Sequence, residues 1–127
     1  MKRTTFLLTT AVIALMFGVG MIILPNVIAS VFGLANMNPS AEFLLRCMGT
    51  MYFSMGIANY IVRNQTDSVA LKAILIMNIT YHILSMGTDI HATIIGTLPL
   101  LQTVPAHIVH LFVAIGSFIF LKKLKTA

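Results

Sequence analysis

The stretch LKAILIMNITYHILSMGTD, residues 71–89, decides the fold of this chain. It is apolar enough to cross a bilayer, because a spanning helix needs about 20 mostly apolar residues. Polar groups nevertheless recur along it at helical spacing, so they share one face of the helix. These residues are Asn78, His82, Ser85 and Asp89. Polar side chains inside a membrane need partners, which the rest of the chain must supply.

The composition of the whole chain is that of a membrane protein. Of its 127 residues, 58% are hydrophobic and only 9% are charged, which is more apolar than a soluble domain of this size requires. The formal net charge of +5 does not indicate nucleic-acid binding, because the basic residues lie at the ends of apolar stretches rather than in a stripe with aromatic residues. Cys47 is the single cysteine, which excludes an internal disulfide and a cysteine-based metal motif.

Three further apolar stretches flank the central one and predict an all-α, polytopic membrane protein. We expect a single domain, residues 1–127, that forms an antiparallel bundle of four transmembrane helices. The expected spans are residues 5–24, 41–62, 70–89 and 106–121.

Three details of the helix boundaries follow from local signals. The central helix either stops near Asp89 or continues to about Ile95, before Gly96 and Pro99 interrupt the pattern. Pro105 suits the first position of the fourth helix. A short amphipathic helix from about Val27 to Leu34 is expected to lie at the membrane interface.

The basic residues predict the orientation. Seven of the eight lysines and arginines flank the spans on the side that holds both termini and the loop at Arg63, and Arg46 is the exception. The positive-inside rule therefore places both termini in the cytoplasm. This topology brings the remaining ionisable groups to the outer leaflet as one polar cluster. Its expected members are Glu42, Arg46, Asn78, His82, Asp89, His107 and His110.

Arg46 has two candidate partners. Glu42 lies one helical turn earlier and forms an i, i+4 pair with it. Asp89 from a neighbouring helix is the second candidate, and a pair with it would fix the register of two helices and leave an arginine clamp for an anionic group.

Three interpretations of His82, His107 and His110 remain open. As neutral groups they hydrogen-bond across helices. As titrating groups beside Asp89 they relay protons or sense external pH. As ligands they hold a metal ion or a haem, which neutral imidazoles in a helix bundle commonly do, although no HExxH motif is present.

Small residues predict where helices approach each other closely. Ala11, Ala14 and Gly18 share one face of the first span. Gly49 and Gly56 are expected to be close-approach points on the second, because small residues let helix backbones pack tightly in lipid.

The second span also resembles a known family. Its sequence Arg46-Cys47-Met48-Gly49, followed by Gly56-Ile57-Ala58-Asn59, is similar to the second helix of small DoxX-like bacterial membrane proteins. Four spans, a proline after the first and a lysine-terminated fourth are also similar to that family. Some members are linked to quinone-coupled sulfur oxidation, so the resemblance allows a quinone-linked role. No catalytic residue is carried over, because the histidine cluster does not map onto a family active site.

The leading functional hypothesis is a bacterial inner-membrane protein that is noncatalytic or not demonstrably catalytic. The sequence has no nucleophile elbow, Walker sequence, zincin motif or dinucleotide fingerprint. We expect the polar cluster to bind a small ligand or a partner membrane protein, with the chain acting as an accessory subunit, a homo-oligomer or a part of a larger membrane complex. The alternative is a haem-, metal- or quinone-linked redox protein that uses the histidines. The second alternative is a proton-coupled transporter or channel.

Overall fold

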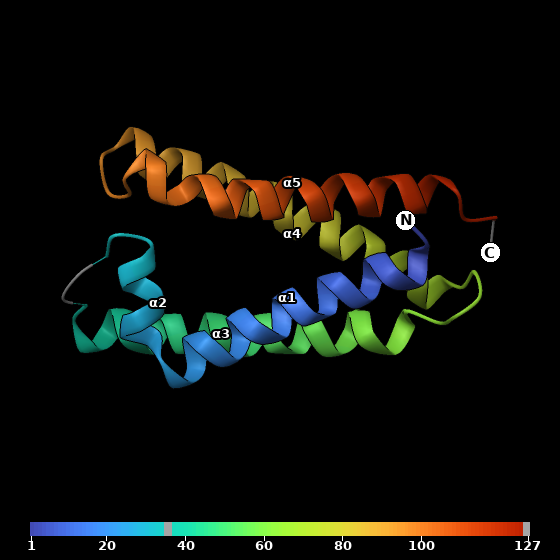
Figure 1. Cartoon of the computed structure of the whole chain (residues 1–127), viewed down its shortest axis with the longest axis horizontal. Coiled ribbons are helices and arrows are strands. Elements are labelled where there is room, and N and C mark those ends of the chain that lie inside the picture. Colours follow the sequence, from blue (N-terminus) through green and yellow to red (C-terminus); the bar gives the residue numbers. More distant parts are fainter. Residues whose placement is uncertain (35–36, 126–127) are drawn as a thin grey trace.

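The computed structural model describes residues 1–34 and 37–125, and over these residues it is all-helical. In chain order the helices are α1 (Arg3–Ile23), α2 (Pro25–Val31), α3 (Pro39–Val62), α4 (Val69–Ile94) and α5 (Leu100–Lys122). The all-α prediction is confirmed. Figure 1 shows the four long helices running roughly along one common direction, with the short α2 set across one end.

The long helices form two antiparallel pairs. α1 packs mainly against α3, and α4 packs mainly against α5 (Figure 1). The two pairs meet at the end that holds both termini and the α3–α4 loop, and they diverge toward the end where α2 lies. The space between the pairs therefore widens with distance from the termini.

Apolar packing closes the end of the bundle near the termini. The Phe6 ring of α1 lies against α5, with its centroid 5.5 Å from that of Phe112 and 5.2 Å from that of Phe120. Gly116 leaves room for this ring, because a Cβ at that position would overlap it. The buried core around it draws on every long helix: Phe6, Leu7, Val62, Leu71, Leu75 and Val113.

Glycines hold α1 and α3 in close contact, as the sequence predicts. A Cβ added to Gly18 would lie 2.6 Å from the backbone nitrogen of Phe53, and one added to Gly49 would lie 2.9 Å from the carbonyl oxygen of Gly18. A Cβ on Gly56 would lie 2.7 Å from Cγ of Leu15. Real Cβ atoms do not reach such distances, so these positions require glycine unless the backbones separate.

Two helix boundaries differ from those expected. α4 continues to Ile94, past the expected end of the 70–89 span and close to the longer alternative. α5 begins at Leu100 rather than near residue 106, with Pro105 inside the helix, so the prediction that Pro105 opens it is wrong. Pro105 lies beyond the first four residues of α5, whose N–H groups have no intrahelical partner, so it removes the backbone hydrogen bond to the carbonyl of Leu101.

The short α2 begins earlier than the expected range of Val27 to Leu34. Pro25 occupies its first position, because proline lacks the N–H that would be unpaired there. The helix ends at Val31, and Gly33 follows with a φ of 76°, a conformation that favours glycine.

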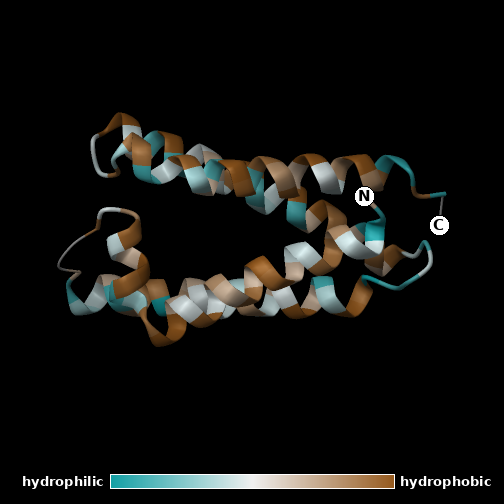
Figure 2. Cartoon of the chain, in the orientation of Figure 1, coloured by the Kyte–Doolittle hydropathy of each residue, from teal (hydrophilic) through white to brown (hydrophobic). Residues whose placement is uncertain are grey.

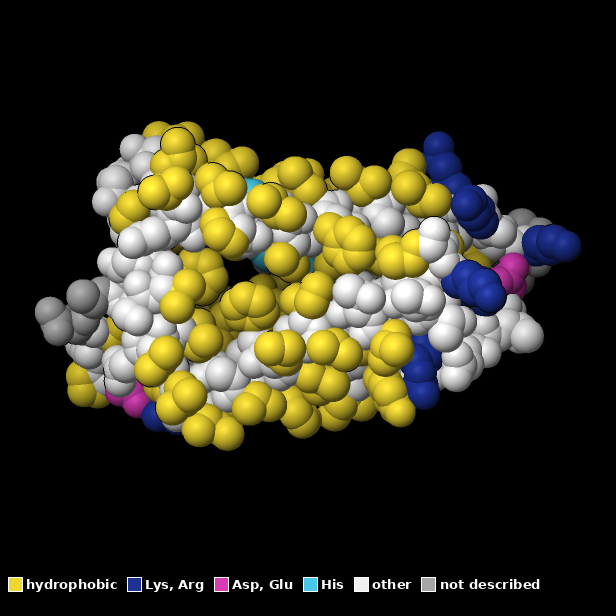
Figure 3. Space-filling model, viewed as in Figure 1, with side chains coloured by type: hydrophobic (Ala, Val, Ile, Leu, Met, Phe, Trp, Pro, Cys, Tyr) yellow, Lys and Arg dark blue, Asp and Glu magenta, His cyan; other side chains and the backbone are white. Residues whose placement is uncertain are grey.

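Three of the helices, α1, α4 and α5, are long and apolar enough to cross a membrane. α3 occupies the predicted 41–62 span but is not among these three, because Glu42, Arg46 and Asn59 interrupt its apolar sequence. Figure 2 shows hydrophobic residues along all the long helices, and Figure 3 shows apolar side chains over their flanks with lysines and arginines gathered at the end near the termini. These features indicate a membrane protein.

Candidate functional site

The polar stripe of α4 faces the interior of the bundle. Asn78 and His82 are buried, whereas Ser85 and Asp89 are half-buried. The stripe therefore starts deep between the helix pairs and reaches the end where the pairs diverge. Each of its residues meets a different environment.

Asn78 joins the two helix pairs. Its amide Nδ2 donates to Oδ1 of Asn59 at 2.8 Å, and Nδ2 of Asn59 donates back to Oδ1 of Asn78 at 3.1 Å. The sequence-based cluster did not include Asn59. The available signal was an asparagine in each of two consecutive apolar stretches, since antiparallel neighbours bring such residues to similar depths.

A second contact joins α4 to α5. Nδ1 of His82 lies 2.7 Å from Nδ1 of His110, and Nε2 of His110 lies 3.4 Å from Oδ2 of Asp89. The three side chains thus form a continuous chain of hydrogen-bonding groups. Both rings are buried, with His82 5% and His110 6% exposed.

One assignment of protons satisfies this chain with both rings neutral. A neutral imidazole carries one N–H. If Nδ1 of His82 donates to Nδ1 of His110, the N–H of His110 is on Nε2 and donates to Asp89. The reverse assignment would place the bare Nε2 of His110 against a carboxylate oxygen, where two lone pairs repel. We therefore assign the Nδ1–H tautomer to His82 and the Nε2–H tautomer to His110.

His107 lies near the same carboxylate. Its Nε2 is 4.0 Å from Oδ2 of Asp89, which is too long for a hydrogen bond. This nitrogen is buried and has no hydrogen-bond partner among the described residues. His107 thus contributes to the surroundings of Asp89 without being part of the chain that His82 begins.

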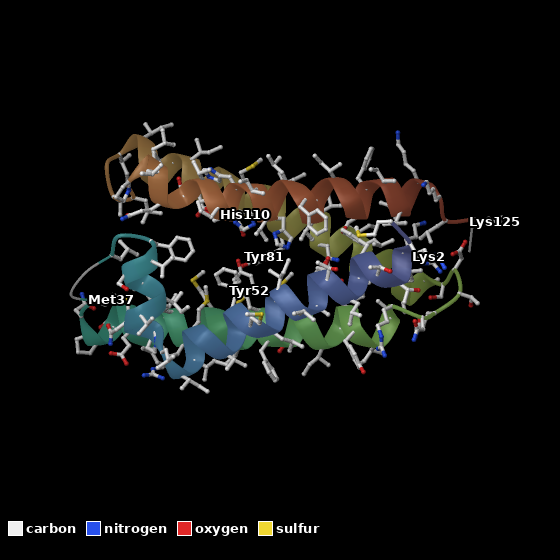
Figure 4. All side chains as sticks on the ribbon, viewed as in Figure 1. Lys2, Met37, Tyr52, Tyr81, His110 and Lys125 are labelled. Carbon is white, nitrogen blue, oxygen red and sulfur yellow. The ribbon has the colours of Figure 1, made fainter. Side chains whose placement is uncertain are left out.

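Two tyrosines extend the cluster toward α3 and were not predicted as site residues. The rings of Tyr52 and Tyr81 lie edge to face with their centroids 5.4 Å apart, and Tyr81 lies 5.3 Å from the ring of His82. Figure 4 shows Tyr52, Tyr81 and His110 close together between the helix pairs. The sequence carried a partial signal, because Tyr81 is adjacent to His82 and aromatic rings with a hydroxyl are unusual at this depth.

A cavity of about 380 Å³ lies between the helix pairs, within the range of about 300–1,000 Å³ typical of small-molecule sites. All five helices contribute to its wall, which is mostly apolar. Figure 3 shows a hollow between the pairs with histidine atoms beside it. The polar side chains on the wall are Thr10, Tyr52, Tyr81, His82, Ser85, Thr88, Asp89 and His110.

The predicted cluster separates into two groups. Arg46 donates to Oε1 of Glu42 at 2.7 Å and also to the carbonyl oxygen of Ile22. Both partners belong to the α1–α3 side, so Arg46 pairs with Glu42, the first candidate, and not with Asp89. The i, i+4 geometry explains this result, since Glu42 is already one turn away on the same helix. Neither Glu42 nor Arg46 lines the cavity.

The histidines do not form a three-ligand metal site in the part of the chain that the structure describes. Among the residues that the structure describes, no group of three or more histidine, cysteine, aspartate or glutamate side chains is placed to hold a metal ion. The separation of 2.7 Å between the Nδ1 atoms of His82 and His110 is that of a hydrogen bond.

Comparisons of the chain with protein-family models, curated protein sequences and solved structures found no match. The resemblance to small DoxX-like membrane proteins therefore stays a prediction.

Proposed function

We propose that this chain is a bacterial inner-membrane protein that binds one small, mainly apolar molecule in the cavity between its two helix pairs. The observation that carries the proposal is the position of His82, His110 and Asp89 on the wall of this otherwise mostly apolar cavity. Apolar walls with a few convergent polar groups are the usual composition of a ligand pocket. The apolar part of the ligand gives affinity, and the polar groups orient it.

The proposal includes four spans, with α3 as the fourth. At 1.5 Å per residue its 24 residues extend over about 36 Å, enough for a hydrocarbon core of about 30 Å. Its polar groups have partners, since Arg46 pairs with Glu42 and Asn59 pairs with Asn78. Paired groups cost less in lipid than free ones, so a modest hydropathy is compatible with a span packed along α1.

Both termini are proposed to lie in the cytoplasm. The lysines and arginines at that end of the bundle support this orientation (Figure 3). A fluorescent protein that matures only in the cytoplasm should fluoresce when fused after the C-terminus and stay dark when fused in the α4–α5 loop at residue 97. The opposite pattern would reverse the orientation.

A small ligand explains the cavity better than a partner protein does, because the cavity lies between helices rather than on an outer face. Association with a second copy or a larger membrane complex would use the exposed apolar flanks of the helices. The two kinds of binding therefore do not compete for the same residues.

A cavity-filling substitution tests the proposal. Ala106 lines the cavity, and Ala73 on α4 is exposed. Native mass spectrometry of protein purified with its lipids should detect a bound small molecule on the wild type and on Ala73→Phe, and the molecule should be lost from Ala106→Phe. Equal retention of the molecule by both variants would refute binding in this cavity.

A further inference from the structure

The cavity wall carries one formal charge. Of the described residues that line the cavity, Asp89 is the only carboxylate, and none is a lysine or an arginine. Arg46, the arginine of the predicted cluster, donates to Glu42 and to the carbonyl oxygen of Ile22 on the α1–α3 side. The side chain of Asp89 is only 26% exposed. A carboxylate in such surroundings is partly shielded from water and has no lysine or arginine beside it on the cavity wall.

The neighbouring histidines do not supply a counter-charge. In the neutral proton assignment given above, the Nε2–H of His110 donates to Asp89 and neither ring carries a charge. His107 makes no hydrogen bond to the carboxylate, because its Nε2 lies 4.0 Å from Oδ2 of Asp89. With no lysine or arginine among the described residues of the cavity wall, the negative charge of Asp89 is left for a ligand to balance.

Aromatic rings on the wall favour the same sign of ligand charge. Phe17 and Phe32 line the cavity together with Tyr52 and Tyr81. The face of each ring carries partial negative charge and attracts a cation within about 6 Å of its centroid, most strongly where water is excluded. An anion would meet the Asp89 carboxylate without a lysine or arginine on the described wall to compensate it.

We infer that the ligand of this cavity is a lipophilic monovalent cation, an organic ammonium or phosphonium with apolar substituents, whose charge is balanced by Asp89. This inference rests on the proposed binding function and specifies its ligand class. The apolar wall takes the substituents, and the rings of Tyr52 and Tyr81 lie beside the charged centre. Figure 3 shows the hollow bordered by apolar side chains, which suits a ligand that first partitions into lipid.

Two probes of similar shape and opposite charge test whether the cavity prefers a cation to an anion. Binding of tetraphenylphosphonium and of tetraphenylborate to the purified full-length protein in neutral detergent should be measured by equilibrium dialysis against empty micelles. The wild type should bind the phosphonium and exclude the borate. Because this comparison uses one protein, it does not depend on whether a variant folds.

Asp89→Asn should lower the affinity for tetraphenylphosphonium by about ten- to a hundredfold, the usual effect of losing a charged partner. Asp67→Asn is the matched control, because it makes the same chemical change in the α3–α4 loop, away from the cavity wall. It should leave the affinity unchanged. Far-UV circular dichroism should confirm that both variants are helical.

The outcomes separate this inference from the proposed function. Equal binding of the two probes, or an unchanged phosphonium affinity in Asp89→Asn, would overturn the cation inference. If a neutral short-chain benzoquinone binds, is displaced by Ala106→Phe and is indifferent to Asp89→Asn, while neither ion binds, the cavity is a ligand site for neutral molecules and only the cation inference fails. If none of the three probes binds and no molecule co-purifies, both are wrong.

Discussion

The side-chain amides of Asn59 on α3 and Asn78 on α4 donate to each other, at 2.8 and 3.1 Å, and both side chains are fully buried. Nδ2 of Asn59 also donates to the carbonyl oxygen of Met55 at 2.9 Å. α3 and α4 otherwise contact each other little, so this amide pair is a principal link between the helix pairs. It lies between the apolar core near the termini and the polar chain that begins at His82.

Breaking this link should weaken the bundle. Asn78→Leu leaves Oδ1 of Asn59 without a donor, and we expect the free energy of unfolding to fall by about 1–3 kcal/mol. Asn59→Leu should have a similar effect. The double variant should lose less than the sum of the two, with a coupling of about 0.6–1.7 kcal/mol, the range found for hydrogen bonds between membrane helices.

Unfolding in mixed micelles, followed by far-UV circular dichroism, measures these differences. Strictly additive effects would mean that the two amides stabilise the bundle independently.

The α1–α3 contact should not accept a methyl group. In Gly18→Ala the new Cβ would meet the backbone of Phe53 at 2.6 Å, and a backbone atom cannot rotate away. We expect a loss of about 1–3 kcal/mol in unfolding free energy. Gly87 in α4 is the matched control, because a Cβ there has no atom within 4 Å, so Gly87→Ala should be neutral or stabilising by about 1 kcal/mol. A Gly18→Ala protein as stable as Gly87→Ala would show that α1 and α3 can separate at no cost.

The spacing of residues along each helix predicted the polar stripe of α4 and the close contact between α1 and α3. The stripe from Asn78 to Asp89 and the close approach at Gly18 and Gly49 depend only on helical periodicity and residue size, both of which are visible in a sequence. The expectation that His82 and Asp89 would meet α5 histidines came from antiparallel threading and agrees with the observed contacts.

Which helices pack together, and which side chain pairs with Arg46, could not be predicted from spacing along one helix. Four antiparallel helices can pair in several ways, and spacing along one helix does not say that α1 packs on α3 while α4 packs on α5. Arg46 was therefore open to either Glu42 or Asp89. The cavity and the position of Tyr52 on its wall follow from the divergence of the two pairs, which is a tertiary property.

The end of the bundle near the termini should be sensitive to acid through Asp67. Nη1 of Arg3 donates to Oδ1 of Asp67 at 2.6 Å, and the backbone N–H of Lys125 donates to Oδ2 at 2.9 Å. These donors, with Arg3 the larger influence, hold the pKa of Asp67 below its ordinary value of 3.8. The α3–α4 loop is thereby tied to both termini.

Because the folded pKa is depressed, the stabilisation is fully present above the ordinary pKa and is lost as pH falls through the folded value. Thermal unfolding of the wild type and of Asp67→Asn should therefore differ at pH 7, and the difference should close as the pH is lowered well below about 4. A difference that stays constant over this range would mean that the Asp67 charge does not support the fold.

The contact between His82 and His110 predicts which ring nitrogens carry protons. Nitrogen NMR of histidine-labelled protein in bilayers at neutral pH should show His82 protonated at Nδ1 and His110 protonated at Nε2, because only this assignment gives Asp89 a donor and keeps both rings neutral. His82→Leu removes the donor to His110 but leaves its Nε2–H on Asp89, so the His110 tautomer should persist. His91, which is exposed, provides an internal reference. A doubly protonated His110 would place a cation beside Asp89, and the cavity would then have no uncompensated charge.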